Sequence, residues 1–201
     1  KAFQEICSIQ CPEDAITFDC GFDDIKVEDI TLEKEYNGVT VSVTAHLGTA
    51  IIPFSMDIGF GDIVIPEPIE IDYPLLLDEM PKVSIYAYSL ETVVAEKFET
   101  MIDRGLANSR MKDFFDVYTI LKAEHLNHDI LHEAIISVFN NRGTGYYENH
   151  VLFNGDFKND PIKQTQWNSF LKKIKYKESL PFSDVIDYIT NKLERYWSTI
   201  K

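Results

Sequence analysis

Three charged residues fall on helix faces that the sequence predicts to be apolar. Lys97 lies in the middle of one such face, and Arg110 and Asp113 lie on the apolar side of the next predicted helix, from which Lys112 points away. An unpaired charge is costly to remove from water, so inward charges pair with one another or face a polar site. The face around Lys97 is formed by Leu90, Val93, Val94, Phe98 and Met101.

Two interpretations of these inward charges are open. In the first, an ion pair between Lys97 and Asp113, or between Arg110 and Asp113, fastens the two helices together. In the second, the same residues line a polar cleft that binds an anionic ligand. The pattern alone does not separate the two.

Two aspartates mark the end of a predicted strand. Asp57 lies on the strand, and Asp62 follows a turn that contains Gly59 and Gly61. Glycine permits a sharp turn there, which leaves the carboxylates exposed. Because Mg²⁺ prefers a few carboxylate oxygens together with phosphate oxygens, Asp57 and Asp62 are candidate metal ligands. An acidic surface turn also explains Asp62, so Asp57 is the stronger candidate.

Lysines are concentrated in one segment of an otherwise acidic chain. Residues 158–177 include six lysines and one acidic residue. A solvated helix face accounts for such a run, but it is also where the phosphate backbone of RNA could bind. The candidate RNA contacts are Lys158, Lys163, Lys172, Lys173, Lys175 and Lys177.

The composition limits the function classes. The 201 residues are 45% hydrophobic, enough for a substantial core, and the formal net charge of −14 disfavours non-specific adhesion to nucleic acid or anionic membranes. No apolar run reaches the length of a membrane span, and the first residues do not form a signal peptide. We therefore predict a cytoplasmic protein without a membrane partner.

The cysteines and one histidine are weak candidates for chemistry. Cys7, Cys11 and Cys20 lack a second Cys or His pair nearby, so reduced thiols are favoured over a zinc site. His46 falls on the polar face of a predicted strand, where a solvated side chain is favoured over a catalytic one.

The first part of the chain is predicted to be rich in strands. Short strands are indicated at residues 15–18 and 25–30, and alternating apolar residues predict longer ones at 39–47 and 50–58, separated by Gly48-Thr49. Pro66 and Pro68 make residues 63–73 an edge strand or a loop. A further extended segment at 83–88 precedes the helices.

The rest of the chain is predicted to be helical. Ser89 and Gly105 have the residue types that begin and end a helix, and Asn108 or Ser109 can cap the next one. Further helices are expected from residue 127, from Asp160-Pro161 and over residues 183–197, with a loop at 144–157. We predict an α+β fold: residues 1–88 form the β-rich part, with an antiparallel or mixed sheet, and residues 89–201 form a helical portion whose first pair, 89–122, packs on the sheet.

Three segments resemble the AbiEii/AbiGii toxin family of nucleotidyltransferases. They are DIGFGD at 57–62, ETVVAEKF at 91–98 and NSRMKD at 108–113, and the likeness in order and spacing extends to residues 164–167. The resemblance implies a nucleotidyltransferase-like domain followed by a helical domain, in proteins of bacterial abortive infection and toxin–antitoxin systems. It also implies a nucleoside triphosphate substrate with Mg²⁺, an acceptor such as tRNA, and a cognate antitoxin partner.

The resemblance assigns roles to the matching positions. Asp57 corresponds to the later strand carboxylate of the active site, at the metal or the attacking hydroxyl. Lys97 corresponds to the triphosphate-binding lysine, with Arg110 and Lys112 completing the nucleotide-binding motif. Asp113 would orient Lys97, which makes Asp57, Lys97 and Asp113 the implied catalytic residues.

One departure from the family pattern affects activity. The family's first motif, a Gly-Gly or Gly-Ser turn followed by Asp-x-Asp, does not occur in this sequence, and Asp23-Asp24 lacks the glycine turn. Nucleotidyl transfer needs such carboxylates to hold Mg²⁺. Either the chain begins after this motif, which its start at Lys1 favours, or it is a degenerate member that only binds; both predict a catalytically silent chain.

Two other function classes stay open. The chain could be a non-catalytic module that binds a nucleotide, RNA or an antitoxin, with the lysines of 158–177 as the contact surface. Alternatively, the inward charges are purely architectural.

Overall fold

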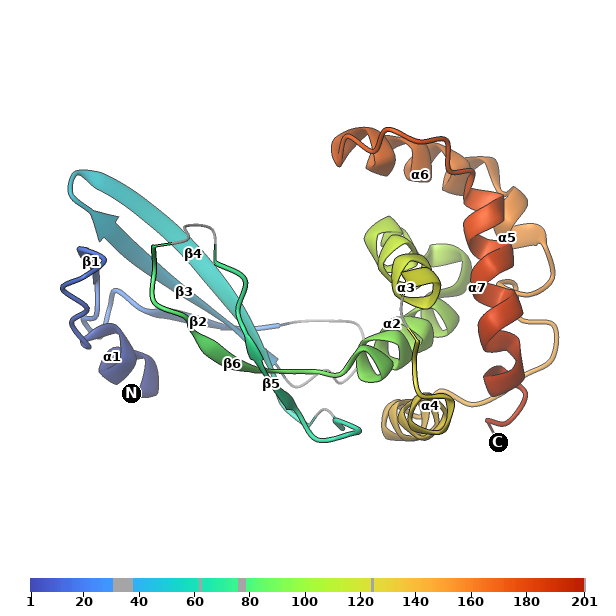
Figure 1. The fold of residues 1–201 in the computed structure, drawn as a ribbon, viewed down its shortest axis with the longest axis horizontal. Helices are drawn as coiled ribbons and strands as arrows, with labels where there is room; N and C mark the ends of the chain where they lie inside the picture. Colours follow the sequence, from blue (N-terminus) through green and yellow to red (C-terminus); the bar gives the residue numbers. More distant parts are fainter. Residues whose placement is uncertain (31–37, 62, 76–78, 124, 201) are drawn as a thin grey trace. The chain divides into compact units, whose positions relative to one another are not determined.

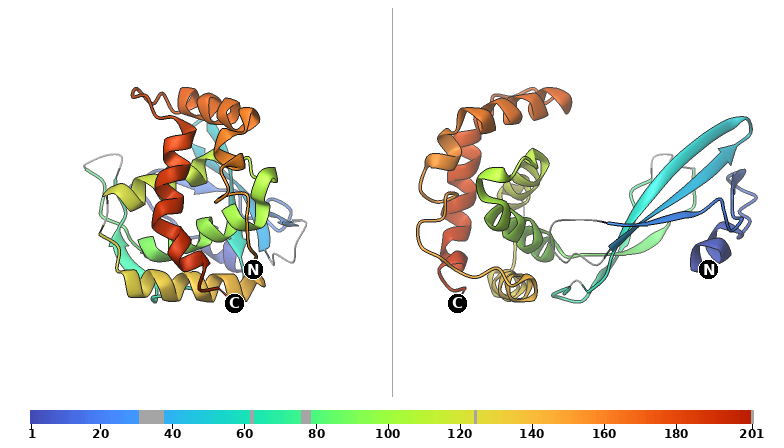
Figure 2. Two further views of the ribbon diagram at one scale, coloured as in Figure 1. Left: turned by 90° about the vertical axis from the view of Figure 1, so that its right-hand side faces the viewer. Right: turned by 180° about the vertical axis from the view of Figure 1, so that it is seen from behind.

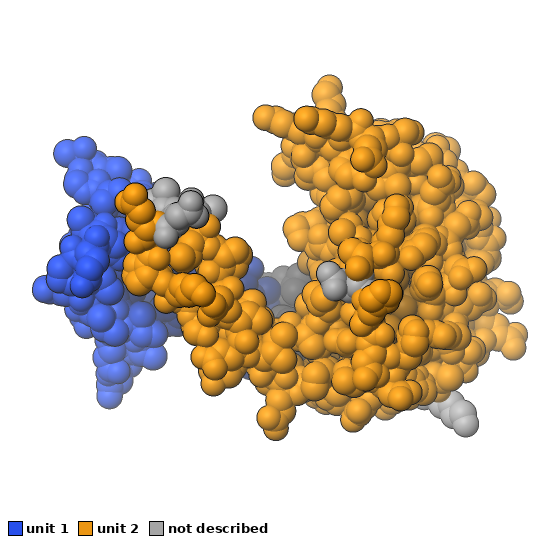
Figure 3. Space-filling model, in the orientation of Figure 1, with its two compact units in different colours: residues 1–62 blue, residues 63–201 orange. Residues whose placement is uncertain are grey.

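The chain forms two compact units in a computed structural model that describes residues 1–30, 38–61, 63–75, 79–123 and 125–200. The first unit is Lys1–Asp62 and the second is Ile63–Lys201 (Figure 3). No described helix has the length and apolar character needed to cross a membrane.

The first unit is an antiparallel sheet with a short helix. It contains α1 (Ala2–Cys7), β1 (Ile16–Phe18), β2 (Lys26–Asp29), β3 (Gly38–Leu47) and β4 (Ala50–Gly59). Strand β3 pairs with the three other strands, and it pairs with β4 over its whole length (Figure 1). The β3–β4 hairpin turns at Gly48, whose φ of +58° is easily adopted by glycine.

Alternation along β3 and β4 gives this sheet an apolar face. Val41, Val43 and Ala45 are buried, and their partners on β4 are Met56, Phe54 and Ile52. The predicted strand at 39–47 and the turn at Gly48-Thr49 are therefore confirmed. His46 lies on the opposite face, with its Nε2 3.0 Å from Asp19 Oδ2. Cys7, Cys11 and Cys20 are free thiols.

The second unit begins with a hairpin and continues as helices. Strands β5 (Ile69–Asp72) and β6 (Ser84–Ala87) pair antiparallel. The helices are α2 (Leu90–Arg104), the 3₁₀ turn η1 (Gly105–Ala107), α3 (Met111–Ala123), α4 (His128–Arg142), α5 (Asp156–Asn159), α6 (Pro161–Lys173) and α7 (Phe182–Trp197) (Figure 2).

The helix boundaries follow the predicted capping residues. Ser89 Oγ accepts a hydrogen bond from the Thr92 N–H at 3.1 Å, and Gly105 ends α2 with a φ of +45°. Asn108, rather than Ser109, supplies the side chain before α3, since its Oδ1 accepts from the Arg110 N–H at 2.9 Å. The one-turn helix α5 was not predicted; it falls at the end of the expected loop, where Phe157 is fully buried.

The core of the second unit lies among its helices. Helix α2 packs against α4 and α3, and α3 packs against α7 and α6. The predicted apolar face of α2 was partly wrong. Val94, Phe98 and Met101 are buried as predicted, but Leu90 is 40% exposed, and Ala95 and Ile102 are buried as well. The buried face of α2 is rotated relative to the predicted one, because Thr92 is buried. Its hydroxyl donates to the Ile65 carbonyl oxygen at 2.6 Å.

The predicted α+β fold, an antiparallel sheet followed by helices, is confirmed. The change from strands to helices falls between β6 and α2, while the compact units divide the chain between residues 62 and 63. The packing of the helix pair on the sheet stays a prediction.

Candidate functional site

Five charged side chains from α2, from α3 and from Arg110 just before α3 meet in one network, which we call the α2–α3 charge cluster. Lys97 Nζ lies 2.5 Å from Asp113 Oδ1 and 3.0 Å from Asp116 Oδ2. Arg110 Nε lies 2.5 Å from Asp113 Oδ2, and Lys112 Nζ lies 2.5 Å from Asp116 Oδ2. The cluster thus joins Lys97, Arg110, Lys112 and Asp113, all predicted from the sequence, to Asp116.

Burial within the cluster is graded. The side chain of Asp113 is 5% exposed and that of Lys97 is 21% exposed, whereas Arg110 is 57% and Lys112 73% exposed. The inward placement of Lys97 and Asp113 and the outward placement of Lys112 are as the helical pattern predicts. The prediction that Arg110 lies on the apolar side was wrong, because Arg110 precedes the first residue of α3, Met111, and its side chain is mostly exposed. Asp113 is therefore the buried anchor, and the two exposed cations form a rim that a ligand can reach.

The contacts hold Lys97 and Asp113 in their charged forms. Burial by itself would lower the pKa of Lys97, but hydrogen bonds to Asp113 and Asp116 outweigh it and raise that pKa above its ordinary value. Burial would raise the pKa of Asp113, but hydrogen bonds from Lys97 and Arg110 hold it below the usual range. Both groups are ionised at neutral pH.

The ion-pair interpretation is confirmed for both cations, since Asp113 accepts from Lys97 and from Arg110. This pairing is compatible with binding an anion. Three cations face two carboxylates, and an ammonium has three N–H donors, of which Lys97 uses two. The cluster therefore carries a local positive surplus in a protein of net charge −14.

Asp116 was missed from the sequence. It accepts from Lys112 and lies within ion-pair distance of Lys97, so it ties the rim to the buried part of the cluster. Its spacing was a usable signal, because Lys112 and Asp116 are four residues apart on one helix.

A second network that the sequence did not reveal joins α2 to α4. Arg142 donates to Glu96 and, at 2.7 Å, to Glu99, and Thr144 Oγ1 donates to Glu99 at 2.5 Å. Glu99 is buried, and it follows Ala95 at the four-residue spacing of one helix face. This network fixes the helix that carries Lys97.

Asp57 belongs to the first unit, whereas the charge cluster belongs to the second. Asp57 is exposed on β4, and its Oδ1 accepts from Thr40 Oγ1 at 2.7 Å. Asp62 lies outside the described residues. The convergence of Asp57 with Lys97, Arg110 and Asp113 stays a prediction.

The carboxylates that the structure describes do not fit a complete magnesium site. No group of three or more His, Cys, Asp or Glu side chains among the described residues is arranged to hold a metal ion. Asp57 offers one carboxylate with a hydroxyl beside it. A magnesium ion held by this chain would require further oxygen ligands.

The six predicted RNA-contact lysines divide into three kinds. Lys163 is 3% exposed, donates to the Asn108 carbonyl oxygen at 2.6 Å and lies 5.6 Å from the Phe157 ring centre. Burial lowers the pKa of Lys163, although nearby Asp160 opposes this. Lys158 pairs with Asp187 at 2.5 Å. The remaining four, Lys172, Lys173, Lys175 and Lys177, are exposed.

We expect Lys163→Ala to lower the free energy of unfolding by about 2 kcal/mol, because it removes buried methylene groups and leaves the Asn108 carbonyl without its donor. Lys173→Ala on the same helix is the matched control, expected to stay within about 0.5 kcal/mol. Urea denaturation at pH 7 measures both. Equal stabilities would mean that Lys163 has no structural role.

Comparison with known proteins places the sequence in a family. Residues 10–191 match the family described as nucleotidyl transferase AbiEii toxin, type IV TA system. No curated protein and no solved structure matches the chain. Because the family match spans most of the sequence, the chain belongs to the AbiEii family of nucleotidyl transferase toxins of type IV toxin–antitoxin systems.

Proposed function

We propose that this chain is the nucleotide-binding part of a nucleotidyltransferase toxin that uses a nucleoside triphosphate and transfers a nucleotide to an acceptor such as tRNA. The observation that carries the proposal is the α2–α3 charge cluster, in which Lys97, Arg110 and Lys112 gather around two carboxylates. A triphosphate is the nucleotide group that such a gathering of cations fits.

Each member of the cluster has a distinct part in this proposal. Lys97, held in place by Asp113 and Asp116, directs its remaining N–H toward a phosphate oxygen. Arg110 bonds Asp113 through Nε, and its guanidinium is more than half exposed, so its other nitrogens can donate to the triphosphate. Lys112 adds charge at the rim. Asp113 acts as a positioning residue because it orients both Lys97 and Arg110.

The proposed reaction also requires Mg²⁺, as the family resemblance implies. When bound, Mg²⁺ would neutralise the triphosphate and polarise the phosphorus that is attacked. Asp57 and Asp62 are the ligands that this chain would contribute. These two carboxylates are too few for a full magnesium site.

A competition experiment tests the nucleotide-binding proposal. A fluorescent nucleoside triphosphate should be displaced by unlabelled triphosphate and by inorganic tripolyphosphate, but not by the nucleoside, because the cluster recognises the phosphates. Displacement by the nucleoside alone would contradict the proposal. So would failure of the labelled nucleotide to bind at all.

We also expect the 201-residue chain to be catalytically silent, because its sequence lacks the Asp-x-Asp motif. Incubation with labelled nucleoside triphosphates, Mg²⁺ and tRNA should give no incorporation above background. Incorporation that Asp57→Ala abolishes would refute this expectation and would identify Asp57 as catalytic.

The family assignment also suggests the biological setting. We propose a cytoplasmic toxin with a cognate antitoxin protein as its partner. The alternative is a non-catalytic module that binds nucleotide, RNA or antitoxin, and it is favoured by the exposed lysines at the end of α6.

A further inference from the structure

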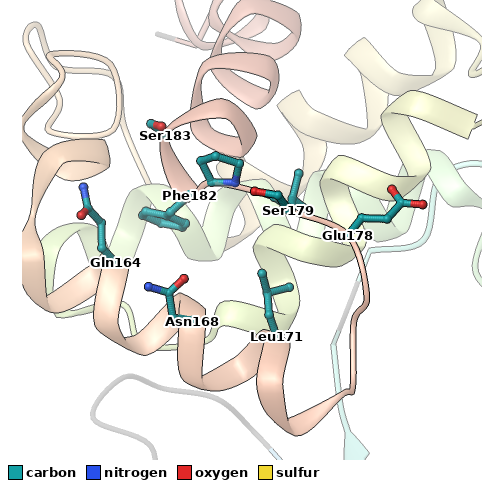
Figure 4. A pocket seen from close by; sticks show the side chains of 9 residues that line it. Gln164, Asn168, Leu171, Glu178, Ser179, Phe182 and Ser183 are labelled. Atoms are coloured by element: carbon teal, nitrogen blue, oxygen red, sulfur yellow. The ribbon is translucent and has the colours of Figure 1, made fainter.

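A pocket of about 450 Å³ opens between α6 and the start of α7 (Figure 4). None of the described residues that line it belongs to the α2–α3 charge cluster. Its lining combines the amides of Gln164 and Asn168 with the hydroxyls of Ser179 and Ser183. Apolar side chains, among them Phe182, line the rest. Gln164 and Asn168 are four residues apart on α6 and therefore share one face of that helix.

Among the described residues that line the pocket there are hydrogen-bonding groups but no cation. The one charged residue among them is Glu178, whose carboxylate repels phosphate and accepts from amino groups. Amide side chains can donate to and accept from the edge of a nucleobase at the same time. The lining is thus suited to a base and unsuited to a phosphate.

Four exposed lysines lie in the stretch of chain between two residues that line this pocket. Lys172, Lys173, Lys175 and Lys177 fall between Leu171 and Glu178, both of which line it. No ion pair is found for these four within the described ranges, in contrast to Lys158. Phosphate-binding groups therefore adjoin base-binding groups in the sequence, which matches the two kinds of group, phosphate and base, within a nucleotide.

A hydrogen bond ties the chain just after the lysines to α6. Trp167 Nε1 donates to the Leu180 carbonyl oxygen at 2.7 Å, three residues after Lys177. Lys175 has a φ of +55°, a left-handed conformation in which glycine is favoured at the end of a helix. Glycine would be less strained than lysine at this position.

We propose that the α6–α7 pocket and its four lysines bind an unpaired nucleotide of single-stranded RNA, with the base in the pocket and the flanking phosphates on the lysines. This inference rests on the proposed function, since it names the place where an RNA acceptor is held. RNA binding at this pocket requires neither nucleoside triphosphate nor Mg²⁺. It can therefore be tested independently of triphosphate binding at the α2–α3 charge cluster.

The test is fluorescence anisotropy with a labelled eight-residue oligoadenylate and the same ribose-phosphate backbone without bases, in the absence of nucleoside triphosphate and Mg²⁺. The whole chain should bind the oligoadenylate about five to ten times more tightly than the abasic strand, since a held base contributes to affinity. Asn168→Leu should reduce oligoadenylate binding to the abasic level and leave abasic binding unchanged. Equal binding of both strands by the unaltered protein would overturn the base pocket.

The lysines are tested by a matched pair of variants. Replacing Lys172, Lys173, Lys175 and Lys177 by alanine should weaken binding of both strands at least about tenfold and make the slope of log affinity against log salt shallower by about 2 to 3. Replacing Lys1, Lys26, Lys82 and Lys192, which are also exposed, changes the net charge equally and should leave binding nearly unchanged. Equal losses in the two variants would overturn the proposed surface, as would equally tight binding of polyglutamate in place of RNA.

A single substitution separates RNA binding from folding. Lys175→Gly should raise the melting temperature, because glycine relieves the left-handed strain, and should weaken binding of both RNA strands. A variant that is more stable and binds RNA as tightly as the unaltered protein would remove Lys175 from the site.

Discussion

Replacing Asp113 by alanine should lower the free energy of unfolding by about 3 kcal/mol, since removing one partner of a buried ion pair leaves the other charge uncompensated. Asp113 is 5% exposed and accepts from Lys97 and Arg110, so its loss affects two cations. Asp116 still pairs with Lys97 in this variant. The expected loss of stability is therefore at the lower end of the range for broken buried ion pairs. Denaturant titration at pH 7 measures the loss.

The control is Lys112→Ala, which removes an ion pair whose lysine is 73% exposed. Exposed pairs contribute about 0 to 1 kcal/mol, so this variant should differ little from the unaltered protein. Similar stabilities for Asp113→Ala and Lys112→Ala would show that the buried anchor does not hold α2 to α3.

The stability that Asp113 contributes should depend on pH. Because its pKa is lowered in the folded state, the contribution is complete above the ordinary carboxyl pKa of about 3.9 and is lost as the pH falls through the lower folded value. The pKa of Lys97 is raised in the folded state, so its contribution matters at alkaline pH. That contribution is complete below the ordinary lysine pKa of about 10.4 and is lost as the pH rises through the higher folded value. The difference between Asp113→Ala and the unaltered protein should therefore be constant from pH 5 to 9 and shrink in acid.

The second large effect is expected at Trp167. Its side chain is fully buried among the rings of Phe115, Phe170 and Phe182, so Trp167→Ala should cost about 3–5 kcal/mol through lost contacts and the cavity left behind. The substitution also removes the hydrogen bond to the Leu180 carbonyl oxygen. Chemical denaturation followed by circular dichroism provides the measurement.

Trp167→Phe separates the two contributions. Phenylalanine retains an aromatic ring in the core but cannot donate to Leu180, so a loss of about 1–2 kcal/mol is expected. If Trp167→Phe cost as much stability as Trp167→Ala, the hydrogen bond would contribute more than the packing of the ring, contrary to the expected order.

The sequence predicted the features that local rules control. Alternation identified β3 and β4, and capping residues such as Ser89 and Gly105 located the ends of α2, because both signals depend on neighbours in the chain. Helical spacing also predicted that Lys97 and Asp113 lie on the inward faces of their helices. Their ion pair could be predicted as well, because the two helices are consecutive and joined by a short connection.

Features that depend on distant residues were not predicted. The Arg142 bonds to Glu96 and Glu99 link positions more than forty residues apart, and Lys163 is buried because Asn108, 55 positions earlier, presents its carbonyl oxygen. Charge alone suggested that Lys163 was a surface residue. A pattern of residue types cannot reveal such partners, because tertiary packing decides which polar atoms meet.

Calorimetric titration of the unaltered protein and Lys97→Met with a nucleoside triphosphate tests whether the α2–α3 charge cluster binds the triphosphate. Methionine retains the length of the side chain but removes the ammonium group, so binding should weaken at least about tenfold while the protein stays folded, since Asp113 retains Arg110 and Asp116 retains Lys112. Lys192→Met, at an exposed position on α7, should bind as the unaltered protein does. Unchanged affinity in Lys97→Met, with only a loss of stability, would show that the cluster is an ion-pair lock and not a triphosphate site.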